Sequence, residues 1–400
     1  MIRTVLVAMA LALPMNALAH TSDTTPPATV VVAFDREGAT PVLVEGVRNF
    51  ESGAPVTAND PVRIASISKL IMALATMRLV DEGKVDLDAD VSDYLGFKVR
   101  SPNHPFAKVT LRQLLTHRAG LRDKAGYIIP LGESLEAKLA DPEAWYAEAR
   151  PGEAPFEYAN LGSPVVATAL EAATGERYDA LLERTVFEPI GVEACVNWIG
   201  CSDDMVARAV ALYRHTNEPA RDYPGDLPPG CPIPVAEGVE CTLEDYVPGT
   251  NASVFSPQGG VRIGIEDLAK IGREVMLAPI RDFLSEKSLK RMQFEVLRGQ
   301  NFRQDFFCTY GLHMQMINLK GRDCLDQLFE DSDLTYFGHS GEAYGLQSGL
   351  WFDSEGRRGF VYFRTQAPPP AGGEDTGGFT EGEKALMKRA ADALAKQQGE

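Results

Sequence analysis

Segments with the composition of β-strands occur at both ends of this 400-residue chain, and segments with helical periodicity fill its middle. The predicted strands cover residues 30–34, 41–47, 310–316, 349–352 and 359–363. Turns are expected at 36–38 and 353–357, and a last helix at 381–395. Strands at both ends of the chain suggest one sheet that is built from both termini. The pattern therefore predicts an α+β sandwich, in which an antiparallel sheet with flanking helices carries an inserted, mainly helical region.

The longest predicted helix covers residues 66–82 and is expected to be amphipathic, with Gly83 as its stop. Its apolar face would consist of Ile67, Leu70, Ile71, Leu74 and Met77. Shorter helices are expected around 111–115, 164–173 and 178–186. The stretch 215–250 is rich in Pro, Gly and acidic residues, and we expect it to form an ordered loop along one wall of a cleft.

Composition excludes some classes of partner. The chain is 44% hydrophobic and 24% charged, as in ordinary globular proteins, and its formal net charge is −17. Nucleic acids and anionic lipids are bound by clustered Lys and Arg, so neither is an expected partner. A peptide or small-molecule substrate remains the expected partner, and the sequence leaves the oligomeric state open.

The N-terminus has the layout of a secretory signal. Arg3 precedes an apolar run, and Ala17-Leu18-Ala19 forms a small-x-small cleavage pattern. The alternatives are a buried N-terminal helix or a membrane anchor, although the run is too short to span a bilayer. We therefore expect a signal peptide at 1–19, a disordered linker at 20–28 and one domain at 29–400. Its sheet part would cover about 29–105 and 300–398, and its helical part about 106–299. The mature protein is expected to be secreted or periplasmic.

Six cysteines lie in the expected mature chain, and their even number permits three disulfides in an oxidising compartment. We expect sequence neighbours to pair, because each bond would then close one loop. The expected pairs are Cys195 with Cys201, Cys231 with Cys241, and Cys308 with Cys324. Free buried thiols are the alternative. A metal site is not expected, because no C-x-x-C occurs and no His has ligand spacing beside these cysteines.

The first candidate for chemistry is the S-x-x-K motif formed by Ser66 and Lys69 at the start of the long helix. Positions i and i+3 share a helix face, so the hydroxyl and the amine can meet. Serine needs a neighbouring base to act as a nucleophile, and a lysine among apolar neighbours can have its pKa lowered enough to serve. The motif is short enough to occur by chance, as a helix-capping Ser and an exposed Lys.

Two later motifs accompany it. Tyr158 and Asn160 form a Y-x-N: the phenol could exchange a proton with a leaving group, and the amide could hold Lys69 or a substrate carbonyl. His339-Ser340-Gly341 stands just before the late strands, where a strand edge could bind an extended substrate. The alternative interpretations are that Tyr158 is a buried tyrosine in a loop and that His339 is a surface histidine in a turn.

Together these motifs resemble those of the serine β-lactamase and penicillin-binding superfamily, whose pattern is S-x-x-K, S-D-N and K-T-G. The flanking sequence resembles the branch that contains class C β-lactamases, D-Ala-D-Ala carboxypeptidases and related esterases. The similar stretches are 63–69, 109–121, 151–162, 174–175, 259–260 and 267–269, in the family's order. The resemblance extends from about residue 28 to 365 and implies a β-lactamase/transpeptidase-like fold without a cofactor.

The resemblance also implies roles. Ser66 would be the nucleophile, and Lys69 and Tyr158 would share the acid–base work, with the general base left open. Asn160 would orient the substrate amide. The backbone N–H groups of Ser66 and Glu342 would form the oxyanion hole. His339 would act on a substrate carboxylate or on Tyr158, and His117 is expected to be structural.

The expected function is a hydrolase that works through an acyl-enzyme on D-amino-acid peptides or small esters. A weak β-lactamase is less expected. His339 stands where efficient β-lactamases of this branch have Lys, and Glu342 adds a negative charge nearby. The alternative from another class is a non-catalytic sensor, although such a protein need not keep Ser66, Lys69 and Tyr158. The sequence has no G-x-S-x-G or H-E-x-x-H motif, which argues against α/β-hydrolase and zincin mechanisms.

Overall fold

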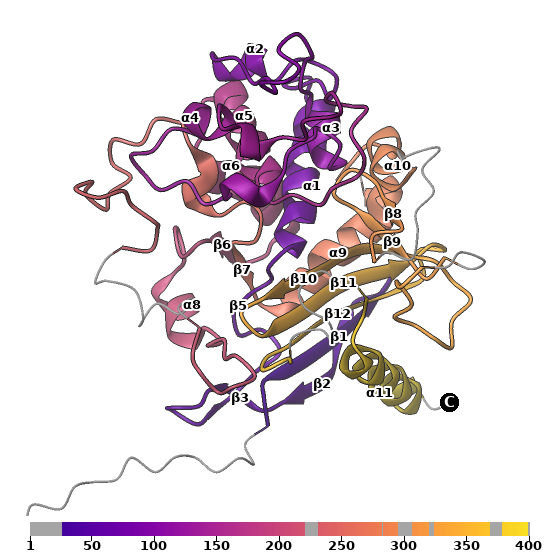
Figure 1. Ribbon diagram of the computed structural model, residues 1–400. Helices are drawn as coiled ribbons and strands as arrows, with labels where there is room; N and C mark the ends of the chain where they lie inside the picture. The colour runs from indigo at the N-terminus through magenta and orange to yellow at the C-terminus, as the bar shows by residue number, and fades with distance from the viewer. Residues whose placement is uncertain are drawn as a thin grey trace, which may run out of the picture.

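The computed structural model describes residues 26–220, 231–281, 283–294, 306–319, 324–368 and 378–398. Its centre is a seven-stranded antiparallel sheet in the order β2-β1-β12-β11-β10-β9-β8 (Figure 1). The strands are β1 (Thr29–Asp35), β2 (Ala39–Glu45), β8 (Thr309–Tyr310), β9 (Gln315–Ile317), β10 (Tyr336–Ala343), β11 (Leu346–Asp353) and β12 (Arg358–Arg364). Because β1 pairs with β12, the two chain ends share one sheet, as the sequence predicted.

Both faces of this sheet are covered, and the period of two in the strands divides their side chains between two cores. Val31, Ala33 and Tyr362 pack with the C-terminal helix α11 (Glu381–Gln398). Val30, Val32 and Phe34 point into the larger core on the opposite face, where α9 (Ile265–Arg281) lies. This explains why β1 is apolar at almost every position instead of alternating with polar residues.

The long helix α1 (Ile67–Asp81) stands between the sheet and the helical region (Figure 1). The prediction that this helix is amphipathic is wrong, because 12 of its 15 residues are buried. It packs against β10 and β11 on one side and against α5 and α6 on another, so almost no face meets solvent. Its buried polar groups are paired: Thr76 Oγ1 donates to Met72 O, and Ser68 Oγ accepts from the Val261 amide.

The remaining helices fall into two groups. Those of the helical region and its borders are α2 (Ser92–Leu95), α3 (Leu111–Leu115), α4 (Leu135–Leu139), α5 (Gly162–Thr174), α6 (Tyr178–Leu182), α7 (Glu188–Ile190) and α8 (Asp203–Arg208). Helix α10 (Glu286–Phe294) packs beside α1 and α9. Single turns occur at η1 (Asp123–Ala125), η2 (Pro142–Ala144) and η5 (Ala252–Phe255), and the π-helical turn η3 (Glu183–Phe187) continues α6. The helices predicted at 111–115, 164–173 and 178–186 are therefore present.

Two small sheets complete the fold. One contains β5 (Val62–Arg63), β7 (Val261–Ile263) and β6 (Ala194–Val196), and the other contains β3 (Val47–Asn49) and β4 (Ala54–Pro55). The first matters for the site, because β5 leads directly into α1. Its neighbour β7 follows Gln258, whose backbone carbonyl oxygen accepts from Lys69 Nζ.

Two late segments differ from the prediction. The strand predicted at 310–316 is split into β8 and β9 by a turn in which the Gly311 amide donates to Met314 O and His313 has a φ of 48°. His339-Ser340-Gly341 was placed before the strands, but it lies inside β10. There Gly338 to Gly341 pair with Trp351 to Ser348 of β11. Pairing with a neighbouring strand outweighs the low β-propensity of this glycine-rich stretch.

The predicted disulfide pairing is confirmed, with bonds Cys195–Cys201, Cys231–Cys241 and Cys308–Cys324. The expected signal peptide lies outside the described residues, and so does most of the linker. At the end of the linker, Ala28 is buried and its carbonyl accepts from Thr365 N. In the described ranges, no helix combines the length and apolarity needed to cross a membrane. The domain boundaries stay a prediction.

The Phe34 ring provides a test of the packing between sheet and helix, because it packs closely against both Gly359 of β12 and Gly272 of α9. A Cβ on Gly359 would lie 2.1 Å from Phe34 Cζ, whereas a Cβ on Gly38 would meet nothing within 4 Å. We expect Gly359→Ala to lower the free energy of unfolding by about 1–3 kcal/mol, because the buried ring must move. Gly38→Ala should change it by less than about 0.5 kcal/mol. Urea unfolding of both variants measures this, and equal stabilities would contradict the packing described.

Candidate active site

Ser66 lies where β5 turns into α1. Ala65 has a φ of 47°, a left-handed conformation that redirects the chain so that Ser66 starts the helix. The Ser66 side chain makes no capping bond to its own helix, so its Oγ remains available to the groups around it. β10 passes very close: a Cβ on Gly341 would lie 2.4 Å from Ile64 O and 3.3 Å from Ala65 Cβ. Only glycine fits at this position of the H-S-G motif.

Lys69 lies one helical turn after Ser66 and is fully buried. Its Nζ is 3.1 Å from Ser66 Oγ, 2.8 Å from Asn160 Oδ1 and 2.9 Å from Gln258 O. Burial lowers the pKa of this amine to about 7, although the negative charge of Asp123 opposes that shift. Near neutral pH, a large fraction of Lys69 is therefore an uncharged amine in contact with the serine hydroxyl.

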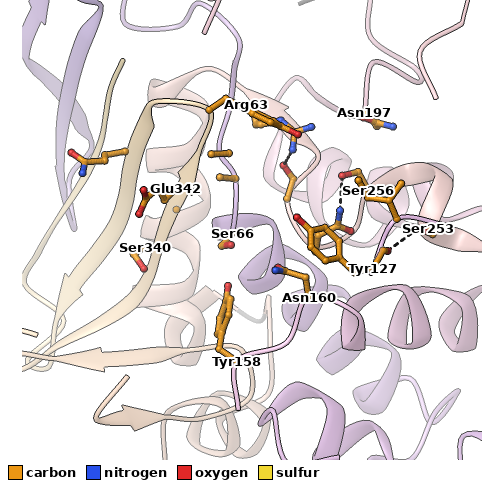
Figure 2. A pocket seen from close by; sticks show the side chains of 18 of the residues that line it. Arg63, Ser66, Tyr127, Tyr158, Asn160, Asn197, Ser253, Ser256, Ser340 and Glu342 are labelled. Atoms are coloured by element: carbon orange, nitrogen blue, oxygen red, sulfur yellow. Dashed lines mark hydrogen bonds between the residues drawn. The ribbon is translucent and has the colours of Figure 1, made fainter. Parts of the chain in front are cut away.

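Tyr158 lies beside Ser66, and Figure 2 shows its hydroxyl directed at the serine side chain. Burial raises the pKa of the Tyr158 phenol well above its ordinary value, so the phenol stays protonated at neutral pH. Lys69 Nζ lies 4.7 Å from the centre of the Tyr158 ring. The two predicted acid–base groups thus lie beside the same hydroxyl but differ in protonation: the amine can accept a proton, and the phenol can donate one.

Asn160 comes from the loop before α5, and Asp123 fixes its orientation. One carboxylate oxygen of Asp123 accepts from the backbone N–H and from the side-chain Nδ2 of Asn160, both at 2.9 Å. The other oxygen accepts from Leu161 N at 2.9 Å. Because both Nδ2 and the backbone are held, Asn160 Oδ1 must point at Lys69. The sequence analysis missed Asp123, although it lies two residues beyond the similar stretch 109–121.

His339 lies beneath this site and away from the cleft. It is fully buried, and its Nδ1 is 2.6 Å from the Ser340 carbonyl oxygen. A carbonyl can only accept, so Nδ1 carries the proton and Nε2 accepts from Tyr310 OH at 2.7 Å. Burial and the nearby Lys69 lower the pKa of His339 to about 3. The imidazole is therefore neutral, and both of its nitrogens have partners inside the protein.

His117 belongs to the same buried layer. Its Nδ1 accepts from Ala159 N at 3.2 Å, and its ring centre lies 4.5 Å from that of Tyr158. It therefore supports the backbone between Tyr158 and Asn160. Burial also lowers the pKa of His117 well below its ordinary value, so it adds no positive charge beside Lys69.

The end of β10 forms one wall of the site. β9 pairs only with Tyr336 to Gly338, so Ser340, Gly341 and Glu342 extend beyond it and line the cleft. Ser340 Oγ donates to Gln315 Oε1 at 3.2 Å. Figure 2 shows Ser340 and Glu342 on this strand beside Ser66. The arrangement fits the strand-edge expectation, and the oxyanion role of the Ser66 and Glu342 amides stays a prediction.

Ser66 opens into a cleft of about 1220 Å³. Part of its wall comes from 231–235 in the long loop that the sequence analysis placed beside a cleft, and residues 221–230 of that loop lie outside the described ranges. Four phenylalanines that have no role in the predicted site also line it: Phe156, Phe306, Phe307 and Phe379. Within the described part of the chain, no group of three or more His, Cys, Asp or Glu side chains has a metal-binding arrangement.

Two curated proteins resemble part of this chain in sequence. Esterase EstB of Burkholderia gladioli is 30% identical over 207 residues, which are 48% of this chain and 51% of the esterase. The D-alanyl-D-alanine-carboxypeptidase/endopeptidase AmpH of Escherichia coli (strain K12) is 31% identical over 140 residues, 33% of this chain and 35% of AmpH. The chain thus matches about half or less of the length of these relatives.

The similarity in fold extends over more of the chain than the similarity in sequence. The crystal structure of D-amino acid amidase from Ochrobactrum anthropi SV3, complexed with D-phenylalanine, superposes with a TM-score of 0.66 at 18% identity, covering 93% of this chain and 95% of the amidase. The sequence model described as Beta-lactamase matches residues 26–379. That match contains Ser66, Lys69, Tyr158 and the β10 motif, and on this basis the chain belongs to the β-lactamase family.

Proposed function

We propose that this protein is an exported serine hydrolase that cleaves amide or ester bonds of D-amino-acid substrates through an acyl-enzyme on Ser66. The observation that carries the proposal is the contact between Ser66 Oγ and the buried amine of Lys69, 3.1 Å apart. A buried lysine without a carboxylate in direct contact is costly unless it works as a neutral base. Asn160 Oδ1 and Gln258 O can accept from the two N–H bonds of the neutral amine, which leaves its lone pair for the Ser66 hydroxyl.

The chemical steps follow from the protonation states. Neutral Lys69 takes the proton of Ser66 Oγ while the oxygen attacks the substrate carbonyl carbon. The backbone N–H groups of Ser66 and Glu342 stabilise the oxyanion. Tyr158 then donates its proton to the leaving amine or alcohol as the bond to the carbonyl carbon breaks, and the ammonium of Lys69 reprotonates Tyr158. Water releases the acyl group by the same steps in reverse.

The D-amino-acid preference is supported by the relatives, which include a D-alanyl-D-alanine-carboxypeptidase and a structurally similar D-amino acid amidase. Export is supported by the three disulfides, which form stably in oxidising compartments, and by the signal-like layout of residues 1–19.

Removal of the nucleophile provides the first test. We expect Ser66→Ala to lower turnover of D-phenylalanine amide and of a nitrophenyl ester by at least about 10³-fold, because no other group can form the acyl-enzyme. The intact mass after brief exposure to the nitrophenyl ester should show an acyl adduct on the wild type only. Ser52→Ala, on an exposed turn, is the matched control. Ester and amide turnover that survives in a folded Ser66→Ala variant would refute this mechanism.

The pH profile tests which group is the base. Lys69 has a pKa of about 7, so its neutral form dominates above that pH. We expect kcat/KM to fall tenfold per pH unit below about 7 and to level off above it. Since the pKa of Tyr158 is raised, a tyrosinate base would instead make the activity increase past pH 10. That second profile would contradict the assignment of Lys69.

Asp123 is proposed as a positioning residue that acts through Asn160 and Lys69. Its negative charge raises the pKa of Lys69 against the effect of burial. We expect Asp123→Asn to move the acidic limb of kcat/KM to lower pH and to lower the plateau about tenfold, because Asn160 loses its orienting acceptor. The measurement is the full pH profile, with Glu136→Gln on exposed α4 as the charge-removal control. If the plateau of kcat/KM fell but the acidic limb stayed at the same pH, the charge of Asp123 would have no effect on Lys69. The role of Asp123 would then be purely structural.

A further inference from the structure

Among the described residues, no Lys or Arg side chain lines the end of the cleft beside Tyr158; the buried Lys69, 4.7 Å from the centre of the Tyr158 ring, is not part of the cleft wall. Among the described residues that line the cleft, Arg63 and Arg214 are the cationic ones. Their guanidinium carbons lie 5.5 Å and 5.9 Å from the centre of the Tyr344 ring, in the turn after β10. Figure 2 shows Arg63 and Tyr158 on opposite sides of Ser66. Both arginines therefore lie at the end of the cleft that is remote from Tyr158.

His339, the residue from which sequence similarity predicts contact with a substrate carboxylate, does not supply a charge here. It is buried, and its two nitrogens are bound to the Ser340 carbonyl and to Tyr310 OH. The acidic side chain of Glu383 also lines the cleft, next to Phe379, and it accepts from Thr380 and Tyr362. A carboxylate bound at this end would face the Glu383 carboxyl, whose pKa burial raises despite the nearby Arg364, and no Lys or Arg among the described residues that line this end of the cleft.

Aromatic rings occupy the same end. The Phe307 ring stacks on Tyr158 with centres 4.6 Å apart and planes 7° apart. Phe307 in turn contacts Phe156 and Phe306 at 5.9 Å and 5.0 Å, and Phe306 meets Phe379 edge-on at 4.9 Å. The bond Cys308–Cys324 anchors the backbone next to Phe307. We call Phe156, Phe306, Phe307 and Phe379 the aromatic wall.

Tyr158 fixes which part of the substrate meets this wall. In the proposed mechanism its hydroxyl donates a proton to the leaving group, so the leaving group must lie beside Tyr158 and hence beside Phe307. The acyl group extends toward the other side of Ser66. An apolar ring next to Phe307 would gain contact area and favourable ring packing, whereas a carboxylate would lose its water without a partner.

We propose that the aromatic wall is a leaving-group subsite that selects uncharged, aromatic or apolar amines and alcohols and excludes a free terminal carboxylate. The inference rests on the proposed function and narrows it: the protein acts as an amidase or esterase, and D-amino-acid peptides with a free C-terminus are poor substrates.

The test keeps the acyl group constant and changes only the leaving group. N-acetyl-D-alanine is linked to D-alanine, D-alaninamide, methylamine or benzylamine, and kcat/KM is measured for wild type, Phe307→Ala and Phe307→Leu. Phe106→Ala is the matched control, because Phe106 is 99% exposed and lies outside the cleft lining. The Leu variant keeps apolar bulk without the ring, so it remains informative where Ala impairs folding.

We expect wild type to favour D-alaninamide over D-alanine by at least about 100-fold. The ratio of kcat/KM for the benzylamine substrate to kcat/KM for the methylamine substrate should fall about tenfold in Phe307→Ala. It should fall less in Phe307→Leu and stay constant in Phe106→Ala. Equal or faster turnover of the D-alanine substrate, or a ratio that Phe307→Ala leaves unchanged, would overturn the subsite while leaving the serine hydrolase intact. No turnover of all four substrates by folded wild type would refute the proposed function and the subsite with it.

Discussion

The burial of one amine organises this structure. Lys69 has no contact with water, and its Nζ is held by a serine hydroxyl, an asparagine carbonyl and a backbone carbonyl from three separate segments. Each acceptor must be fixed independently, because an unsatisfied amine at this depth would cost several kcal/mol. Asp123 fixes Asn160, and the Ser68 hydroxyl accepts from Val261 N, which holds β7 and the segment before it against α1. The helical region and the sheet are joined at this point.

The position of α1 makes this burial possible. A helix on the surface of a sheet would leave Lys69 a path to solvent, whereas α1 is enclosed by β10 and β11 on one side and by helices of the inserted region on another. The same enclosure brings β10 against the start of the helix. Gly341 is required there because any side chain would collide with Ile64 O. Ser66, the proposed nucleophile, and the strand edge are thus brought together by packing between layers, not by local sequence.

The charge states of the groups in the site depend on the same burial. Burial makes Lys69 partly neutral and keeps His117 and His339 uncharged, so the site combines one titrating amine with neutral hydrogen-bonding groups. Low dielectric strengthens each remaining dipole, including backbone N–H groups directed at a developing oxyanion. The stacked ring of Phe307 extends this apolar environment to the proposed position of the leaving group. The proposed reaction and the proposed substrate preference therefore both depend on the burial of these groups.

The sequence by itself determined the strands at both ends, the helix from Ser66, the cysteine pairs and the motifs around Ser66, Tyr158 and His339. These are readable because strand alternation, helical spacing, turn residues and short motifs are local properties. Tertiary structure alone decided that α1 is buried on nearly all sides, that His339 faces Tyr310 instead of the cleft, and that Asp123 orients Asn160. It also decided that Gln258 supplies a backbone carbonyl and that Phe307 stacks on Tyr158. Such contacts join residues far apart in the chain. Their energies depend on burial and on distances of a few ångströms, which no local pattern records.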